Sequence, residues 1–69
     1  MDESPELRLL FHRLNNQLGV ILAHAELLEA KSTDPTARAR AAQVVASALE
    51  AMTTTKEIRA KTVIDTPRN

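Results

Sequence analysis

The chain has 69 residues, no cysteine, two histidines and nine basic residues against nine acidic ones. This composition excludes disulfides, disfavours a structural zinc site and leaves no net charge to attract nucleic acid or a membrane surface, so we expect neither as a partner. A single hydrophobic core of this size rarely contributes more than about 3–5 kcal/mol, so we expect one domain, residues 1–69, that needs a partner subunit.

The first predicted helix spans about residues 5–30. One glycine, one aromatic residue and many helix-forming residues already indicate an all-α fold. Ser4 offers a hydroxyl N-cap, and Pro5 suits the first helical position. Apolar residues then recur at intervals of four and seven and form one continuous stripe, as in a bundle helix. This stripe consists of Leu7, Phe11, Leu14, Leu18, Ile21, Ala25 and Leu28.

Residues 31–34 interrupt the pattern and form the predicted turn. Asp34 is a natural N-cap and Pro35 suits the N1 position, so a second helix is predicted over about residues 35–61, followed by a frayed tail over 62–69. So short a connection makes the two helices antiparallel neighbours. The residues of the second helix predicted to point inward are mostly small: Ala41, Val45, Ala48, Leu49, Met52 and Ile58.

A monomer of this kind would leave much of its apolar stripes exposed. We therefore expect an antiparallel helical hairpin that forms a homodimeric four-helix bundle with a second copy. The longest apolar run, residues 18–23, is too short to span a bilayer. Because no pattern of a secretory signal begins the chain, we expect a cytoplasmic location.

His12 falls outside the apolar stripe, with Asn16 one helical turn away and the small residues Gly19 and Ala23 beyond it. Small neighbours leave room for the backbone of another protein to approach the imidazole. An unperturbed, exposed histidine is largely neutral at pH 7, and a neutral imidazole can act as a nucleophile. The alternative is an incidental polar face, because a lone exposed histidine on a helix usually has no chemical role.

The segment LFHRLNNQLGVIL (residues 10–22), continuing as AHAELL (residues 23–28), resembles the H-box of two-component sensor histidine kinases. The resemblance is to the subgroup with a His-x-Leu-Asn-Asn core. In that family the box lies on the first helix of a dimerisation and phosphotransfer hairpin. Carried over by position, the resemblance implies that His12 is the phosphoacceptor and that Asn16 orients a hydrolytic water during dephosphorylation of a partner regulator.

Two features depart from that family. Arg13 stands where the family usually has an acid that accepts a proton during autophosphorylation, and an arginine cannot accept one. Sensor kinases also carry an ATP-binding domain with glycine-rich segments, whereas the only glycine here, Gly19, lies within the first predicted helix. We therefore expect at most a phosphotransferase-like activity and no ATP-binding kinase in this chain, which is either a free-standing hairpin, as Met1 slightly favours, or part of a longer protein.

The resemblance implies that a phosphoryl group passes between His12 and an aspartate of a response-regulator receiver domain in a two-component phosphorelay, with assistance to receiver dephosphorylation as a further role. Mg²⁺ is then expected on the receiver, and no cofactor or metal on the hairpin itself. A separate ATP-binding kinase domain is a second expected partner. Two alternatives stay open: a non-catalytic dimerisation module that binds a kinase or regulator, and a structural hairpin with an incidental histidine.

The remaining polar residues are interpreted more simply. His24 lies 12 residues from His12, roughly 18 Å along a helix, so the two cannot share a metal ion. The basic residues are interpreted as solvated surface: Arg38, Arg40, Lys56, Arg59 and Lys61. The run Thr53–Thr55 is unusual in a helix, and an antiparallel hairpin would bring it to the height of His12, where we expect it to border the phosphoryl site.

Overall fold

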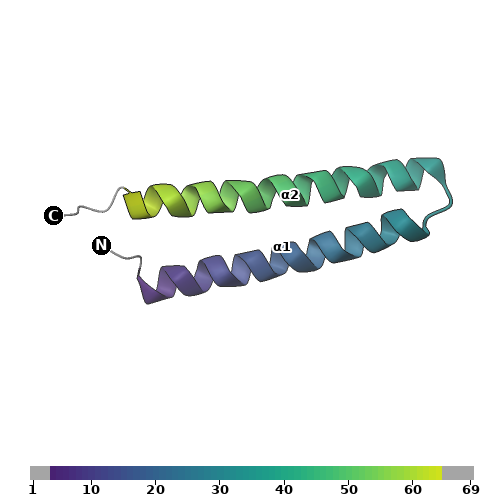
Figure 1. Ribbon diagram of the computed structural model, residues 1–69. Helices are drawn as coiled ribbons and strands as arrows, with labels where there is room; N and C mark the ends of the chain where they lie inside the picture. Colours follow the sequence, from purple (N-terminus) through teal and green to yellow (C-terminus); the bar gives the residue numbers. More distant parts are fainter. Residues whose placement is uncertain (1–3, 65–69) are drawn as a thin grey trace.

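The chain is an all-α hairpin of two antiparallel helices, α1 (Pro5–Lys31) and α2 (Pro35–Ile64), packed against each other (Figure 1). This computed structural model describes the backbone of residues 4–64 and the side chains of residues 4–61. The predicted all-α helical hairpin is confirmed, and no strand occurs in the described part of the chain. Residues 65–69 of the predicted tail lie outside the described residues.

Local capping explains where α1 begins. The Ser4 hydroxyl oxygen accepts a hydrogen bond from the Leu7 backbone N–H at 3.0 Å, and the Arg8 N–H donates to the Ser4 carbonyl. Pro5 occupies the first helical position, where no N–H is needed, and Glu6 places a negative charge in the positive first turn. These contacts satisfy backbone donors that would otherwise have no partner within the helix.

The connection between the helices is three residues long, 32–34, because Lys31 is still helical. The Ser32 N–H donates to the Leu28 carbonyl at 2.9 Å and closes α1. The Asp34 side chain accepts from the Ala37 N–H at 3.0 Å and caps α2. The capping bonds at both sides of this short turn hold the two helices as antiparallel neighbours.

Both helices end later than the predicted boundaries, α1 by one residue and α2 by three. The three residues that follow Lys61 are β-branched: Thr62, Val63 and Ile64. Such residues lower helix propensity by only a fraction of a kcal/mol each, and no glycine or proline stands before Ile64 to stop the helix. The first three residues of the predicted tail, 62–64, are therefore helical.

A narrow seam of mostly small side chains joins the helices. Five of its side chains are buried: Phe11 and Ala25 from α1, and Ala41, Ala48 and Thr55 from α2. Leu7, Leu18, Leu22, Val45 and Met52 are half-buried beside them. The Thr55 hydroxyl donates to the Ala51 carbonyl at 2.8 Å, so a threonine can occupy the seam without an unsatisfied polar group. No side chain within residues 4–61 is completely enclosed, so the seam alone contributes limited hydrophobic stabilisation.

The predicted apolar stripe of α1 is only partly covered by α2, as expected for a single hairpin. Leu14, Ile21 and Leu28 are exposed, although they recur at the same seven-residue interval as the line that packs on α2. Residues three or four apart lie side by side around a helix, so the stripe contains two parallel lines, and one neighbouring helix covers only one of them.

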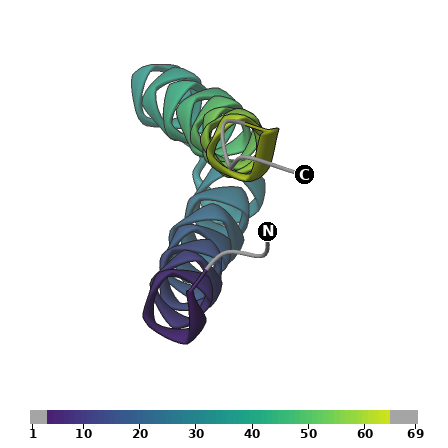
Figure 2. The same cartoon turned by 90° about the vertical axis from the view of Figure 1, so that its left-hand side faces the viewer.

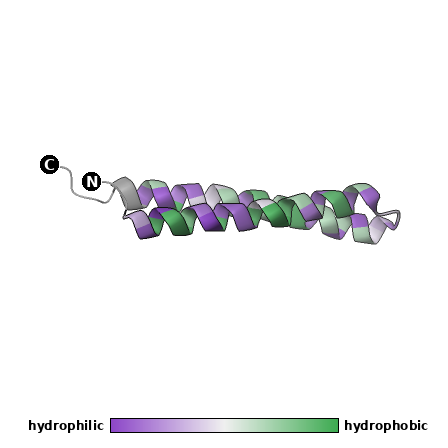
Figure 3. Cartoon of the chain, turned by 90° about the horizontal axis from the view of Figure 1, so that it is seen from below, coloured by the Kyte–Doolittle hydropathy of each residue, from purple (hydrophilic) through white to green (hydrophobic). Residues whose placement is uncertain are grey.

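The apolar residues of α2 divide in the same way, which corrects the prediction for two of them. Leu49 and Ile58 were predicted to point inward, yet they are 49% and 52% exposed. Val44 is 45% exposed, and Val44, Ala51 and Ile58 stand seven residues apart on a second line beside the seam. Hydrophobic residues are accordingly visible along both helices rather than only between them (Figure 3).

The helix axes are inclined to each other and diverge toward the end that carries the termini (Figure 2). Two of the three buried alanines of the seam, Ala25 and Ala41, lie in the half of the hairpin near the turn, where small side chains let the backbones approach. Phe11 is the largest buried side chain and lies in the wider half. The size of the side chains in the seam therefore matches the separation of the helices.

Candidate functional site

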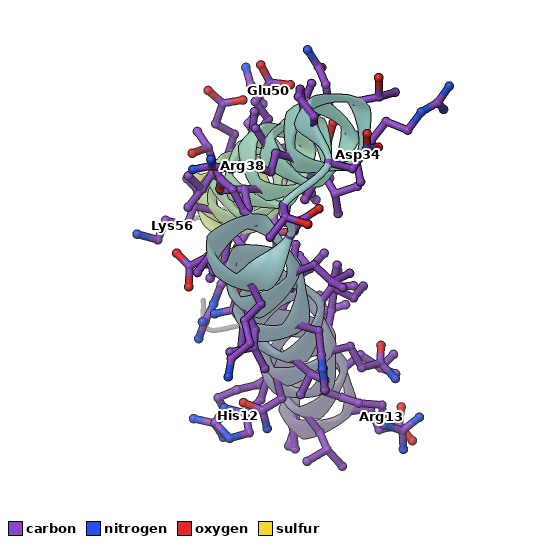
Figure 4. The ribbon with its side chains drawn as sticks, turned by 90° about the vertical axis from the view of Figure 1, so that its right-hand side faces the viewer. His12, Arg13, Asp34, Arg38, Glu50 and Lys56 are labelled. Atoms are coloured by element: carbon purple, nitrogen blue, oxygen red, sulfur yellow. The ribbon has the colours of Figure 1, made fainter. Side chains whose placement is uncertain are left out.

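His12 lies on α1 with its side chain exposed to solvent. It projects from one side of the hairpin, whereas the adjacent Arg13 projects from the other (Figure 4). Asn16 is also exposed and lies one helical turn after His12, so the imidazole and the amide share one face of α1. The structure thus places both residues predicted for the site on one face of α1, and it turns the side chain of Arg13 to a different side from that of His12.

The residues that follow Asn16 on the same face of α1 as His12 are small. Gly19 lies two turns after His12, and a Cβ atom built on it would meet nothing within 4 Å. Ala23, one turn further, is exposed and small. Glycine within a helix is less stable than alanine by roughly 0.5–1 kcal/mol, and packing inside this hairpin does not require it. This flank of α1 therefore has room for a partner to approach closely.

The opposite flank of α1 is apolar. His12 and Ile21 are nine residues apart, about two and a half helical turns, so they lie on opposite sides of the helix. Ile21 and Leu28 of α1 and Val44 of α2 line a hollow of about 310 Å³ above the seam residues Ala25 and Ala41, and we call these five residues the apolar groove. Ile21 is 47% exposed and Leu28 65% exposed, so the groove opens widely to solvent.

Sequence reasoning predicted uncovered apolar surface but not this groove, because it did not divide the stripe into a line that packs on α2 and a line that stays exposed. The signal was present in α2, where residues 44, 51 and 58 repeat every seven positions beside the line of residues 41, 48 and 55. Each helix therefore carries two parallel apolar lines, of which its partner in the hairpin covers one.

The threonine run does not border His12 as predicted. Thr55 lies in the seam, with its hydroxyl bonded to the carbonyl of Ala51. Thr53 and Thr54 are exposed and line a shallow hollow formed by residues of α2 alone, together with Glu50 and Glu57. Antiparallel register brings the run to the height of His12, but the rotation of α2 turns its exposed members away from α1.

Arg59 contacts an aromatic ring, whereas it was interpreted from the sequence as part of the solvated surface. Its guanidinium carbon lies 5.8 Å from the centroid of the Phe11 ring, within the range of a cation–π contact. Phe11 directly precedes His12, so this contact fixes the packing of α1 against α2 at the level of the candidate site.

His24 lies apart from His12 and lines the apolar groove. Within the described residues, no three histidine, aspartate or glutamate side chains gather where they could hold a metal ion. Nor does either helix, as far as it is described, contain an apolar stretch long enough to cross a membrane.

No model of a protein family, no curated protein and no solved structure matches this chain significantly. The resemblance of α1 to the H-box therefore rests on the residues from Leu10 to Leu28 and on their place in the hairpin. An exposed imidazole and an amide on one open flank, with an apolar groove on the other, are the features from which a function can be argued.

Proposed function

We propose that this chain is a dimerisation and phosphotransfer hairpin of histidine-kinase type, in which His12 exchanges a phosphoryl group with an aspartate of a response-regulator receiver domain. One observation carries the proposal: His12 and Asn16 share an open flank of α1, and the apolar groove occupies the opposite flank. A second copy that covers the groove would leave the imidazole accessible to a receiver.

The occupant we propose for the groove is a second copy of the chain. Three further exposed apolar residues, Leu10, Leu14 and Ile58, extend the groove toward the end that carries the termini. The uncovered apolar surface thus runs along the length of the hairpin, and a second hairpin offers a surface of the same length and character. Association would bury side chains that the narrow seam leaves exposed, which a chain without disulfides needs for stability.

The proposed reaction needs no base from the hairpin. A ring nitrogen of neutral His12 attacks the phosphorus of the receiver's aspartyl phosphate, forming an N–P bond as the P–O bond breaks. The aspartate leaves as a carboxylate with the bonding electrons, and the other ring nitrogen of His12 keeps its proton. In the reverse direction the carboxylate attacks and the imidazole leaves. Mg²⁺ belongs to the receiver, where it neutralises charge on the phosphoryl oxygens.

Asn16 has a separate role in the proposal. Its amide is neutral, can both donate and accept hydrogen bonds, and lies one turn from His12 on the same face. When a phosphorylated receiver is bound, this amide would hold a water molecule in line with the aspartyl phosphate and assist its hydrolysis. Phosphate uptake by His12 and phosphate loss from the receiver would then depend on different residues.

The second candidate is a non-catalytic dimerisation module that binds a kinase or regulator in the cytoplasm. Arg13 favours it, because the residue after His12 cannot accept a proton during phosphorylation by an ATP-binding kinase domain supplied by another protein. Incubation with a phosphorylated receiver separates the two functions. Acid-labile phosphate on His12 supports phosphotransfer, whereas receiver binding without phosphate uptake supports the module.

A further inference from the structure

Lys56 projects from the same side of the hairpin as His12, although the two residues come from different helices (Figure 4). Arg13, the direct neighbour of His12 in sequence, projects from the other side. The side chain of Lys56 is exposed. Lys56 is therefore the cation that α2 contributes to this side of the hairpin, whereas Arg8, one helical turn before His12, is the cation that α1 contributes.

The two residues also lie at similar heights along the hairpin. His12 follows the buried Phe11, and Lys56 follows the buried Thr55. Arg59, one turn after Lys56, lies over the Phe11 ring at 5.8 Å. These contacts place His12 and Lys56 within about one helical turn of each other along the axes, or roughly 5 Å. The distance between the two helices adds to this axial offset, and the four methylene groups of the lysine, which rotate freely, let its ammonium group reach toward α1.

The immediate surroundings of both residues are basic, although the whole chain has no net charge. No position one helical turn from His12 or Lys56 is acidic; these positions hold Arg8, Leu9, Asn15 and Asn16 on α1 and Met52, Thr53, Arg59 and Ala60 on α2. The Arg59 guanidinium is engaged with the Phe11 ring. A dianionic group on the imidazole would thus enter a locally positive field to which Arg8 of α1 and Lys56 of α2 both contribute.

We propose that Lys56 binds and positions the phosphoryl group that His12 receives, with its ammonium group paired to phosphoryl oxygens across the two helices. The inference rests on the proposed function, and it assigns to α2 a role in the site. An ammonium group on a flexible chain suits a phosphoryl group that arrives, stays and leaves, because it is a point charge that adapts its geometry.

Phosphoramidate tests this directly, because it phosphorylates histidine without a receiver or a kinase. Its phosphoryl group passes to a ring nitrogen as the P–N bond breaks and ammonia leaves. His24 lines the apolar groove, so the Lys56 variants should leave its own rate unchanged and it serves as an internal reference. Trypsin separates them, since cleavage after Arg8, Arg13 and Lys31 gives the peptides 9–13 and 14–31. The quantity measured is the initial rate at His12 divided by that at His24.

The parent, Lys56→Gln, Lys56→Arg and the control Lys61→Gln are compared at low salt and at 1 M NaCl. Lys61 lies on α2 about 140° around the helix from Lys56. We expect Lys56→Gln to lower the ratio about twofold at low salt, the effect of one charge at roughly 10 Å in water. Lys56→Arg should keep the parent ratio, Lys61→Gln should not change it, and 1 M NaCl should remove the differences.

An unchanged ratio in Lys56→Gln overturns the inference. So does a decrease that Lys56→Arg fails to prevent or that persists at 1 M NaCl, because either would indicate a change in packing rather than in charge. Phosphorylation by phosphoramidate does not depend on a receiver. A chain that shows the Lys56 effect but takes no phosphate from any receiver would therefore contradict the proposed function and leave this inference intact.

Discussion

The guanidinium carbon of Arg59 lies 5.8 Å from the centroid of the Phe11 ring, so the last described turns of α2 hold the only aromatic residue of the chain one position before His12. Cation–π contacts at exposed sites contribute about 0.5–1 kcal/mol. This contact joins the helices where their axes diverge, and it therefore links the candidate site on α1 to α2.

We expect Arg59→Gln to lower the free energy of unfolding by about 0.5–1 kcal/mol, because the ring loses its cation. The measurement is urea unfolding of the parent, Arg59→Gln, Phe11→Leu and the double variant. In the Phe11→Leu background, Arg59→Gln should lower the free energy of unfolding by a smaller amount. The difference between the two decreases is the coupling energy of Arg59 and Phe11. If the decreases in the free energy of unfolding of the two single variants simply add in the double variant, Arg59 stabilises the hairpin through other contacts.

If a second copy covers the apolar groove, one charged side chain introduced among the residues that line it should dissociate the dimer. Ile21→Glu would place a carboxylate among Leu28, Val44 and their copies, where it would be buried without a partner. We expect light scattering to show the mass of two chains for the parent and of one chain, 7.6 kDa, for this variant. The matched control is Ala23→Glu on the flank of His12, which should remain dimeric. A parent that is a folded monomer at micromolar concentration would refute the groove as a self-association surface.

Gly19 offers a test of which flank stays open. Because a Cβ atom there meets nothing within 4 Å, Gly19→Ala should raise the free energy of unfolding by roughly 0.5–1 kcal/mol through helix propensity alone. Thermal unfolding followed by circular dichroism measures the change. Destabilisation by the same substitution would mean that a second copy packs on the flank of His12, contrary to the arrangement proposed here.

Asn16→Ala should separate the two activities of the site. Uptake of phosphate by His12 should be retained, because the nucleophile is unchanged. Dephosphorylation of a bound receiver should slow about tenfold, the effect of losing one hydrogen bond of about 1.4 kcal/mol to the attacking water. Parallel time courses of both reactions with one receiver supply the measurement. Equal loss of both activities would indicate that Asn16 contributes to receiver binding instead.

Local sequence signals predicted the fold because its decisive contacts are local. Ser4 with Pro5, and Asp34 with Pro35, cap each helix through neighbours a few residues away, and the short turn leaves only an antiparallel pair. The shared face of His12 and Asn16 follows from the helical period in the same way.

The rotation of each helix about its axis was not predictable by the same means. The two apolar lines of α1 have the same period and similar side chains, so periodicity alone could not tell which one packs on α2. For the same reason the exposed threonines of α2 were expected beside His12, whereas the structure turns Lys56 to that side. The rotation of each helix depends on how the two helices cross. The small side chains of the seam let the helices approach closely only near the turn.

The central claim is that His12 carries a phosphoryl group, and the most direct measurement is the transfer of labelled phosphate from a phosphorylated receiver to the hairpin. In the parent we expect alkali-stable, acid-labile phosphate in the tryptic peptide of residues 9–13, which contains His12, and none in that of residues 14–31, which contains His24. His12→Gln should abolish phosphate uptake. It should change the free energy of unfolding by no more than about 0.5 kcal/mol, as most surface substitutions do. Uptake by His12→Gln equal to that of the parent, or phosphate confined to the His24 peptide, would contradict the account.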